Sequence, residues 1–298
     1  MDRFIIGFAL VLAALTLIAT AVWDRPDAQS MAVNTSPVRA AATLPAPVAA
    51  VGLAPAPPAQ GMPAASLADQ VDALVAAREP QKAYQAYRLL ADCATFNRDG
   101  DRLIFEDDAV QKNDGVLPGF RAMTEPEKRR DAVLCAGLTE RMRQSRIDYL
   151  AFAARAGIPA AAIAQVSEGP FGDRSAIKTR PDDPMVREWR AQVQDQLARI
   201  AEEQADIGVL SYLSAMRAVG SDVFDQDPAL AYRYGVAMGL IMQELVGADN
   251  ELARLYRPDG SLMQNTASGL TMQERAVQLA QAQRIAATAR ARRLRESP

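Results

Sequence analysis

The two cysteines, Cys93 and Cys135, are the residues of this sequence with the most definite chemistry. They are the only cysteines in the chain, and no C-x-x-C pair is present, so the spacing of a dithiol redox motif is missing. Two thiols in an exported protein are usually oxidised to a disulfide. We therefore predict a structural disulfide that encloses the loop-rich stretch between them. Two separate buried thiols and a redox pair are the alternatives.

A run of oxygen-bearing side chains from Thr95 to Glu106 copies part of a calcium-binding loop. Ligand-type residues alternate along the run, and Gly100 stands where such a loop bends. Two departures weaken the match: Thr95 replaces the expected first aspartate, and Arg102 brings positive charge to a position that is normally apolar. We interpret the run as a polar loop or hairpin turn, with calcium binding as the alternative.

Catalytic side chains are scarce, because the chain contains no histidine. This removes Ser-His and Cys-His nucleophiles, histidine-based zinc sites and the commonest general base. The acidic pairs Asp107-Asp108 and Asp182-Asp183 are adjacent in sequence, whereas glycosidase carboxylates must flank a substrate. Asp183 is also placed to cap a helix. We predict no catalytic, cofactor-binding or metal-binding residue, and expect that the protein is not an enzyme.

Two further features could contact a ligand. The loop Glu168–Asp173 is predicted to be a packed turn, although it could present Phe171 to a ligand. The end of the chain is basic and is predicted to be a solvated, fraying helix end, with acidic lipids or an acidic partner as the alternative contact. Its arginines are Arg284, Arg290, Arg292, Arg293 and Arg295.

The composition indicates an all-α protein that does not bind nucleic acid. Hydrophobic residues make up 49% of the chain, with much alanine, and aromatic residues only 6%, which favours close-packed helices. The formal net charge of -3 offers no general attraction for a polyanion.

The N-terminal part of the chain predicts attachment to a membrane. Residues 4–23 carry no charge and would rise about 30 Å as a helix, enough to span a bilayer. We predict a single transmembrane anchor, with removal as a secretory signal after Ala21 as the alternative. Either way the rest of the chain is exported, into the periplasm if the source is a Gram-negative bacterium. Residues 24–65, rich in proline and alanine, are predicted to be a disordered linker.

Residues 66–298 are predicted to fold as successive helices without notable strands. Caps, prolines and glycines indicate where each helix begins and ends. The expected helices start at Ser66, Pro80, Thr124, Thr139, Pro159, Asp183, Ile207, Asp227 and Thr271, with a loop-rich stretch from Asn97 to about Arg121. The spacing of Trp189, Val193, Leu197 and Ile200 indicates a buried stripe.

Three segments share a spacing of small residues, aromatics and turn glycines. Their shared positions are Ala83, Tyr87 and Ala91; Tyr149, Ala153, Ala154, Gly157 and Ala161; and Gly220, Val223, Asp227, Ala231 and Tyr234. The third segment has Met238-Gly239 where an alanine pair is expected. Alanine lets helices approach closely, an aromatic fills the gap between hairpins, and glycine reverses the chain.

These segments resemble the Sel-one-like repeat family, helical hairpins related to tetratricopeptide repeats. The resemblance implies hairpins stacked as a short, irregular α-solenoid, and an adaptor role in protein assemblies. We therefore expect a membrane-anchored scaffold that binds another envelope protein or an envelope polymer and needs no cofactor. A carboxylate-dependent hydrolase or lyase acting on envelope glycan or peptide is the alternative. Tyr84, Tyr87, Tyr212 and Tyr234 are expected to pack between hairpins rather than to bind a ligand.

Overall fold

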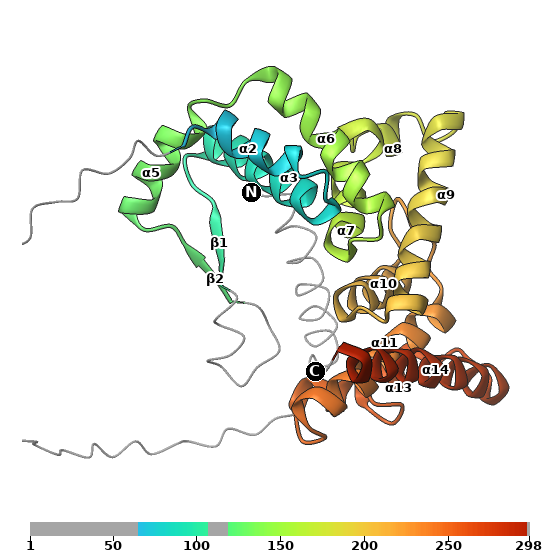
Figure 1. The fold of residues 1–298 in the computed structure, drawn as a ribbon. Helices are drawn as coiled ribbons and strands as arrows, with labels where there is room; N and C mark the ends of the chain where they lie inside the picture. Colours follow the sequence, from blue (N-terminus) through green and yellow to red (C-terminus); the bar gives the residue numbers. More distant parts are fainter. Residues whose placement is uncertain (1–64, 107–118, 297–298) are drawn as a thin grey trace, which may run out of the picture.

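The computed structural model describes residues 65–106 and 119–296, and this part of the chain is mostly helical (Figure 1). The predicted all-α class is confirmed at that level. The predicted apolar anchor at 4–23 and all but the last residue of the linker at 24–65 lie outside the described residues. Within the described ranges, no helix combines the length and the apolar character needed to cross a bilayer.

The helices follow one another along the chain with short connections. Among them, η1 is a short 3-10 turn and η2 is a π-helical turn. The elements are α2 (Leu67–Ala76), α3 (Pro80–Asp99), α5 (Glu125–Cys135), α6 (Glu140–Arg155), α7 (Pro159–Glu168), η1 (Pro170–Gly172), α8 (Ala176–Thr179), α9 (Pro184–Arg199), η2 (Ile200–Gln204), α10 (Ile207–Val219), α11 (Pro228–Val246), α12 (Glu251–Leu255), α13 (Ser261–Thr266) and α14 (Met272–Glu296).

Side-chain caps fix where several of these helices begin. Ser66 accepts a hydrogen bond from the backbone N–H three residues later, and Glu127 accepts bonds from the backbone N–H and the hydroxyl of Thr124. At the start of α11, Asp227 accepts the backbone N–H of Leu230. These starts agree with the predicted ones, because a cap is a local interaction whose residue types stand side by side in the sequence.

The stretch between α3 and α5 contains a β-hairpin that the sequence analysis did not predict. Strand β1 (Leu103–Glu106) pairs antiparallel with strand β2 (Gly119–Ala122). The loop-rich stretch predicted from Asn97 to Arg121 is therefore wrong in part, since α3 continues to Asp99 and two strands follow. Strands of this length are too short to show an alternating pattern, so the sequence offered little signal.

Cys93 in α3 and Cys135 at the end of α5 form a disulfide, as predicted. Their Cα atoms are 4.9 Å apart, and each cysteine is only 1% exposed. The bond lies in a small buried cluster with Leu90, Phe96 and Leu138. It ties α5 and the chain segment that carries the β-hairpin to α3.

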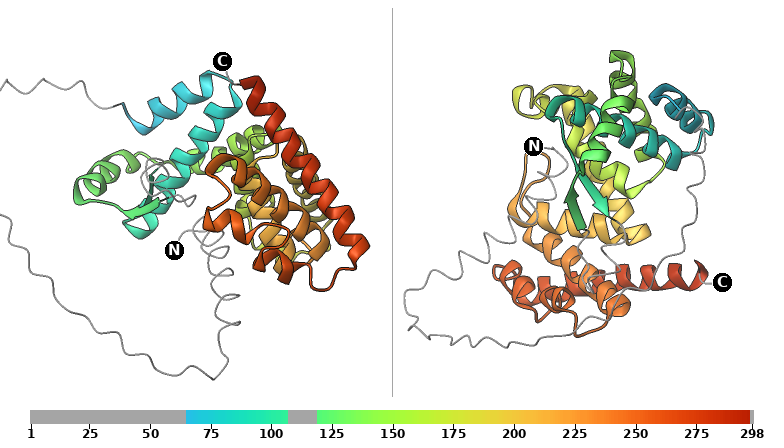
Figure 2. Two further views of the ribbon diagram at one scale, coloured as in Figure 1. Left: turned by 90° about the horizontal axis from the view of Figure 1, so that it is seen from below. Right: turned by 90° about the vertical axis from the view of Figure 1, so that its left-hand side faces the viewer.

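The helices pack largely in chain order and form an arc (Figure 1). Helix α3 packs against α6, α6 against α7, and α7 against both α9 and α10. Helices α10 and α11 form a hairpin, and α11 packs against α14. The right-hand view of Figure 2 shows α2 and α14 at opposite ends of this array.

The largest buried cluster extends from α7 and α9 to α14. It contains the predicted stripe Trp189, Val193, Leu197 and Ile200, whose exposed fractions range from 0% to 7%. The predicted helix that carries this stripe has the expected extent, but its last turn, η2, is π-helical rather than α-helical. The stripe thus holds one side of α9 in the core and leaves the other side in solvent.

Candidate binding surface

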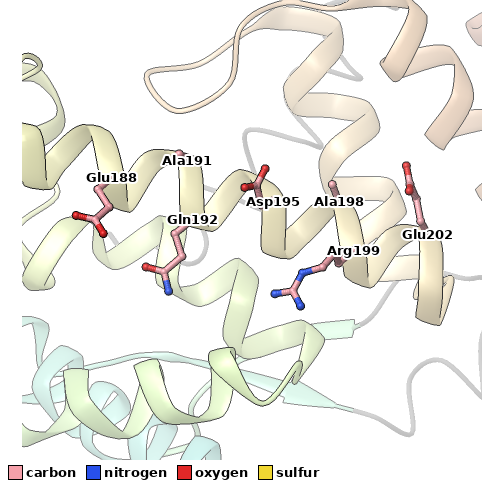
Figure 3. A pocket seen from close by; sticks show the side chains of 7 residues that line it. All are labelled: Glu188, Ala191, Gln192, Asp195, Ala198, Arg199 and Glu202. Atoms are coloured by element: carbon pink, nitrogen blue, oxygen red, sulfur yellow. The ribbon is translucent and has the colours of Figure 1, made fainter.

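The solvent-exposed side of α9 carries a shallow, open patch of side chains (Figure 3). We name this set of residues the α9 face. It consists of Glu188, Ala191, Gln192, Asp195, Ala198, Arg199 and Glu202. Because the buried stripe fixes the rotation of α9, the same stripe determines which residues form this face.

The α9 face is polar and acidic. Three carboxylates stand against one guanidinium, a net charge of -2. Figure 3 shows Glu188 pointing to one side of the helix and Asp195 and Glu202 to the other. Glu202 lies 3.5 Å from Arg233, whereas Glu188 and Asp195 form no ion pair with any described residue. Two of the three carboxylates therefore remain available to a partner.

The open shape of the α9 face suits a long partner rather than a small molecule. Every residue of the face belongs to α9 or η2, so the described residues provide no opposing wall. A small-molecule site normally buries most of the surface of its ligand inside a cavity. The exposed face of one helix can instead contact an extended or helical segment over several turns.

Two carboxylates that are buried or partly buried, Asp131 and Glu168, lie away from this face, and each is paired with an arginine. Asp131, 5% exposed, accepts a bond of 2.9 Å from Arg102 Nε near the disulfide. Glu168 accepts a bond of 2.8 Å from Arg146 Nη2 between α6 and α7. Hydrolysis by two carboxylates needs a facing pair with separated roles, and these two belong to separate clusters. Within the described residues, no group of three or more acidic or cysteine side chains is arranged to hold a metal ion.

Glu168 links three helices in one polar network. Besides Arg146 of α6, it accepts a bond of 3.0 Å from the Tyr87 hydroxyl of α3. Burial raises the pKa of Tyr87 far above its ordinary value, and the neighbouring carboxylate of Glu168 raises it further. Tyr87 therefore stays protonated and acts only as a donor, which holds α3 against the C-terminal end of α7.

Replacing Glu168 by alanine should lower the free energy of unfolding by about 2–3 kcal/mol, because a largely buried guanidinium and a phenol would both lose their acceptor. The Nε of Arg146 has no hydrogen-bond partner among the described atoms, so no other acceptor near the guanidinium can replace the carboxylate of Glu168. Tyr87→Phe is the matched variant and should cost about 1.5 kcal/mol, since it removes one bond and leaves the ion pair. Urea denaturation measures both, and equal losses would contradict the role given to the ion pair.

Comparisons with known proteins were made for the whole chain. No family model, no curated protein and no solved structure matches it. The interpretation of the α9 face therefore depends on its own residues.

The first two repeat-like segments meet in one buried cluster between α3, α6 and α7. Its members from the predicted motif are Ala83, Tyr87, Ala153, Ala154 and Ala161, none more than 6% exposed. Ala91 and Tyr149 are partly buried at its margin, and Gly157, with φ 83°, follows the end of α6. Small side chains thus let these helices pack closely, as the motif predicts.

The third segment lies elsewhere, in the hairpin of α10 and α11. Gly220, with φ 76°, ends α10, and Asp227 caps α11. Val223, Ala231 and Tyr234 are buried, with Val223 and Tyr234 in the largest cluster and not in the one formed by the first two segments. Of the four tyrosines expected to pack, Tyr84, Tyr87 and Tyr234 are buried, and Tyr212 is partly buried against Phe224.

The calcium-like run does not adopt the geometry of a calcium loop. Thr95 and Asn97 lie inside helix α3, where the side-chain amide of Asn97 donates to the carbonyl of Cys135. Asp101 is paired with Lys128 at 2.9 Å, and Arg102 with Asp131. The first positions of the run therefore have helical backbone instead of a loop, and Asp101 and Arg102 are engaged in ion pairs.

Of the two acidic pairs noted in the sequence, the structure describes only Asp182-Asp183. Asp183 accepts the backbone N–H of Met185 and caps α9, as predicted, while Asp182 is exposed beside it. The pair Asp107-Asp108 lies outside the described residues.

The loop before α8 is a packed turn, but Phe171 is not packed within it. Pro170 is buried, whereas Phe171 is 61% exposed and has φ 56°, in the left-handed region. A phenylalanine in this conformation costs about 1–2 kcal/mol. The prediction of a packed turn is therefore wrong for this side chain, because burial depends on neighbours from α6 and α9 that the local sequence does not show.

The basic C-terminal end is not a fraying tail within the described residues. Helix α14 continues to Glu296, and Glu244 of α11 pairs with both Arg290 and Arg293. Arg292 lies 3.5 Å from the carbonyl oxygen of Gln204. These arginines fasten α14 to the rest of the array, so the predicted fraying is wrong. The arginines and Glu244 are too far apart in sequence for the pairing to be predicted.

The α9 face is the candidate binding surface that the sequence analysis did not predict. The sequence does contain a regular spacing that could have drawn attention to this face. Glu188, Asp195 and Glu202 are seven residues apart, and Ala191 and Ala198 repeat the same interval. Only the buried stripe of α9 was interpreted, and the exposed complement of that stripe was left without a role.

Proposed function

We propose that this protein is an exported, membrane-held scaffold that binds another envelope protein through the α9 face. The observation that carries the proposal is an open, acidic face of one helix in an array of helices packed in chain order. Such arrays present long surfaces rather than enclosed sites. We include in the proposal the descent of the hairpins from Sel-one-like repeats, their stacking as a short solenoid, and the anchor at 4–23.

Three features support binding over carboxylate catalysis. The acidic residues of the α9 face are spread along about 20 Å of helix rather than gathered around one point. The buried Asp131 and the partly buried Glu168 are each paired with an arginine. The disulfide between Cys93 and Cys135 supports an oxidising compartment outside the cytoplasm.

Site-specific photo-crosslinking in intact cells tests the proposal. A photoreactive amino acid at Ala191 or Ala198 should give an adduct with one envelope protein, because both positions lie on the α9 face. The same amino acid at Ala136, exposed directly after α5, or at Ala280, exposed on α14, is the matched control and should not give that adduct. Adducts of equal yield at all four positions, or none at Ala191 and Ala198, would contradict a binding role for this face.

The compartment can be tested in the same cells. Acid quenching of the cells, followed by denaturation in the presence of an alkylating reagent, should leave Cys93 and Cys135 unmodified, because both are oxidised in the exported protein. Complete alkylation of both residues would place the folded part in a reducing compartment and contradict export.

A further inference from the structure

Helix α14 has one long side that the other described elements leave uncovered. A row of apolar residues marks this side, which we name the α14 face: Ala276, Ala280, Ala287, Ala291 and Leu294. They are spaced by three, four or seven residues, so they lie along one side of the helix, and all five are exposed. The row extends over about 27 Å. Figure 2 shows α14 along the outer edge of the array.

The α14 face carries large apolar side chains at both ends. Leu294 is 72% exposed, Met272 at the start of the helix is 87% exposed, and Val277 beside the row is 51% exposed. The opposite side of α14 is buried, with Ile285 in the largest cluster. An array of stacked helices normally ends in an element whose outer side is polar, because that side meets water. The last helix of the described residues departs from this rule, which indicates that its outer side meets something other than water.

The charged residues that flank the row are arginines. Arg284 and Arg295 are exposed on this side of the helix and form no ion pair with any described residue. Between Met272 and Arg295 the one acidic residue is Glu274, which lies on another side of α14 and accepts a hydrogen bond from Thr271 at the helix start. The α14 face is thus apolar and cationic, although the whole chain has a net charge of -3.

The chain that precedes the described residues identifies a nearby surface of the matching kind. The uncharged run at 4–23 is the proposed anchor, and residues 24–64 connect it to the first described residue. A flexible connection of this length has an end-to-end distance on the order of 35 Å. The array is then held close to lipid headgroups, so even a weak contact is populated because the encounter takes place within one tethered molecule.

We propose that the α14 face lies on the surface of an anionic bilayer, with Leu294 and Met272 at the level of the acyl chains and Arg284 and Arg295 among the lipid phosphates. A helix with arginines beside an exposed apolar row is suited to this position. The inference rests on the proposed function, because it requires the anchor at 4–23, but it concerns a different surface from the α9 face.

A second copy of this chain is a poorer occupant of the α14 face. Arg284 lies near the middle of the row, so two copies that paired through this face would bring their Arg284 side chains together in either orientation. Like charges in an interface oppose association. Lipid phosphates instead attract both exposed arginines.

Fluorescence quenching of the full chain in nanodiscs tests the inference. Ala287→Cys carries a pyrene label on the α14 face, and Ala191→Cys carries the same label on the α9 face as the matched control. The native cysteines do not react, because both are buried in the disulfide. In a bilayer with phosphatidylglycerol, lipids that carry a nitroxide headgroup should quench the label at 287 and not the one at 191. A bilayer of phosphatidylcholine alone should give weaker quenching, since it does not attract the arginines.

Variants without cations separate the α14 face from the net charge of the protein. In the chain labelled at 287, Arg284→Gln with Arg295→Gln should lower the equilibrium constant for contact about 30-fold, because each arginine near an anionic surface contributes about fivefold. Arg129→Gln with Arg141→Gln is the matched control, since both are exposed on α5 and α6 and neither forms an ion pair with a described residue. The control should change the constant less than about twofold. Equal losses would mean that only net charge is recognised, and would overturn the inference.

Leu294→Gln tests the apolar part of the contact. The side chain is 72% exposed, so the fold should tolerate the change, yet contact should weaken about tenfold because less apolar surface reaches the acyl chains. Unchanged contact would overturn the position given to Leu294.

The remaining outcomes separate this inference from the proposed function. A chain that enters the nanodisc while its label at 287 stays unquenched overturns the inference and leaves the proposed anchor in place. Pyrene excimer emission at 287 would assign the α14 face to a second copy and also overturn it. Failure of the chain to enter the bilayer contradicts the anchor itself, and the inference with it.

Discussion

Replacing Cys93 and Cys135 together by alanine should lower the free energy of unfolding by about 4 kcal/mol. The two residues are separated by 42 positions, and a cross-link across a loop of that size removes much of the freedom of the unfolded chain. The enclosed segment contains α5 and the β-hairpin, which have few buried neighbours besides the cluster around the disulfide. Chemical denaturation of the oxidised chain and of the variant measures the loss.

The loss of the disulfide should destabilise one part of the chain and not the whole fold. Hydrogen exchange of the double variant should show lost protection in α5 and in the paired strands, while α10, α11 and α14 keep theirs, because those helices belong to a different buried cluster. The single variant Cys93→Ala is the matched control and should be destabilised as much as the double variant, since either one removes the cross-link. A loss below about 1 kcal/mol, or a uniform loss of protection, would show that the bond does not hold this segment.

The helix starts could be predicted from the sequence because each depends on residues only a few positions apart. Thr124 and Glu127 form the expected capping box, and Thr271 and Glu274 do the same at the start of α14. The positions of α10 and α11 follow from their caps and end glycines in the same way. The buried stripe of α9 was also predictable, since apolar residues that recur at helical spacing indicate a buried side of a helix.

The elements that the sequence analysis did not predict depend on contacts between distant segments of the chain. The strands β1 and β2 pair across a gap in sequence, and neither is long enough to show alternation by itself. The short helices α12 and α13 have too few turns for a periodic pattern. Likewise, Glu244 pairs with Arg290 and Arg293, so the C-terminal helix, which was predicted to fray, is held against α11.

The candidate site was visible in the sequence but could not be recognised as one. Glu188, Asp195 and Glu202 have a regular spacing, yet exposed acidic residues are common on helices and carry no functional meaning by themselves. They become a candidate site only when the packing of α9 shows which of its sides is exposed, and this requires the arrangement of several helices.

Replacing Gly239 by alanine should lower the free energy of unfolding by about 2–3 kcal/mol, the opposite of the usual effect in a helix interior. A Cβ at this position would lie 2.5 Å from the carbonyl oxygen of Tyr256 and 2.7 Å from its carbonyl carbon. Both are backbone atoms at the end of α12, so relief requires one helix to move from the other. Urea denaturation gives the difference directly.

Gly235→Ala, one helical turn earlier in α11, is the matched comparison. Its Cβ would meet the side-chain ends of Met263 and Ser214, which can rotate away, so the loss should be at least about 1 kcal/mol smaller. The contrast also explains why the third repeat-like segment has Met238-Gly239 where an alanine pair is expected. The chain after α11 folds back over this turn through Tyr256, and a methyl group at position 239 would occupy the space of that backbone. If Gly239→Ala proves neutral, α12 does not pack this closely, and the departure from the alanine pair would need another cause.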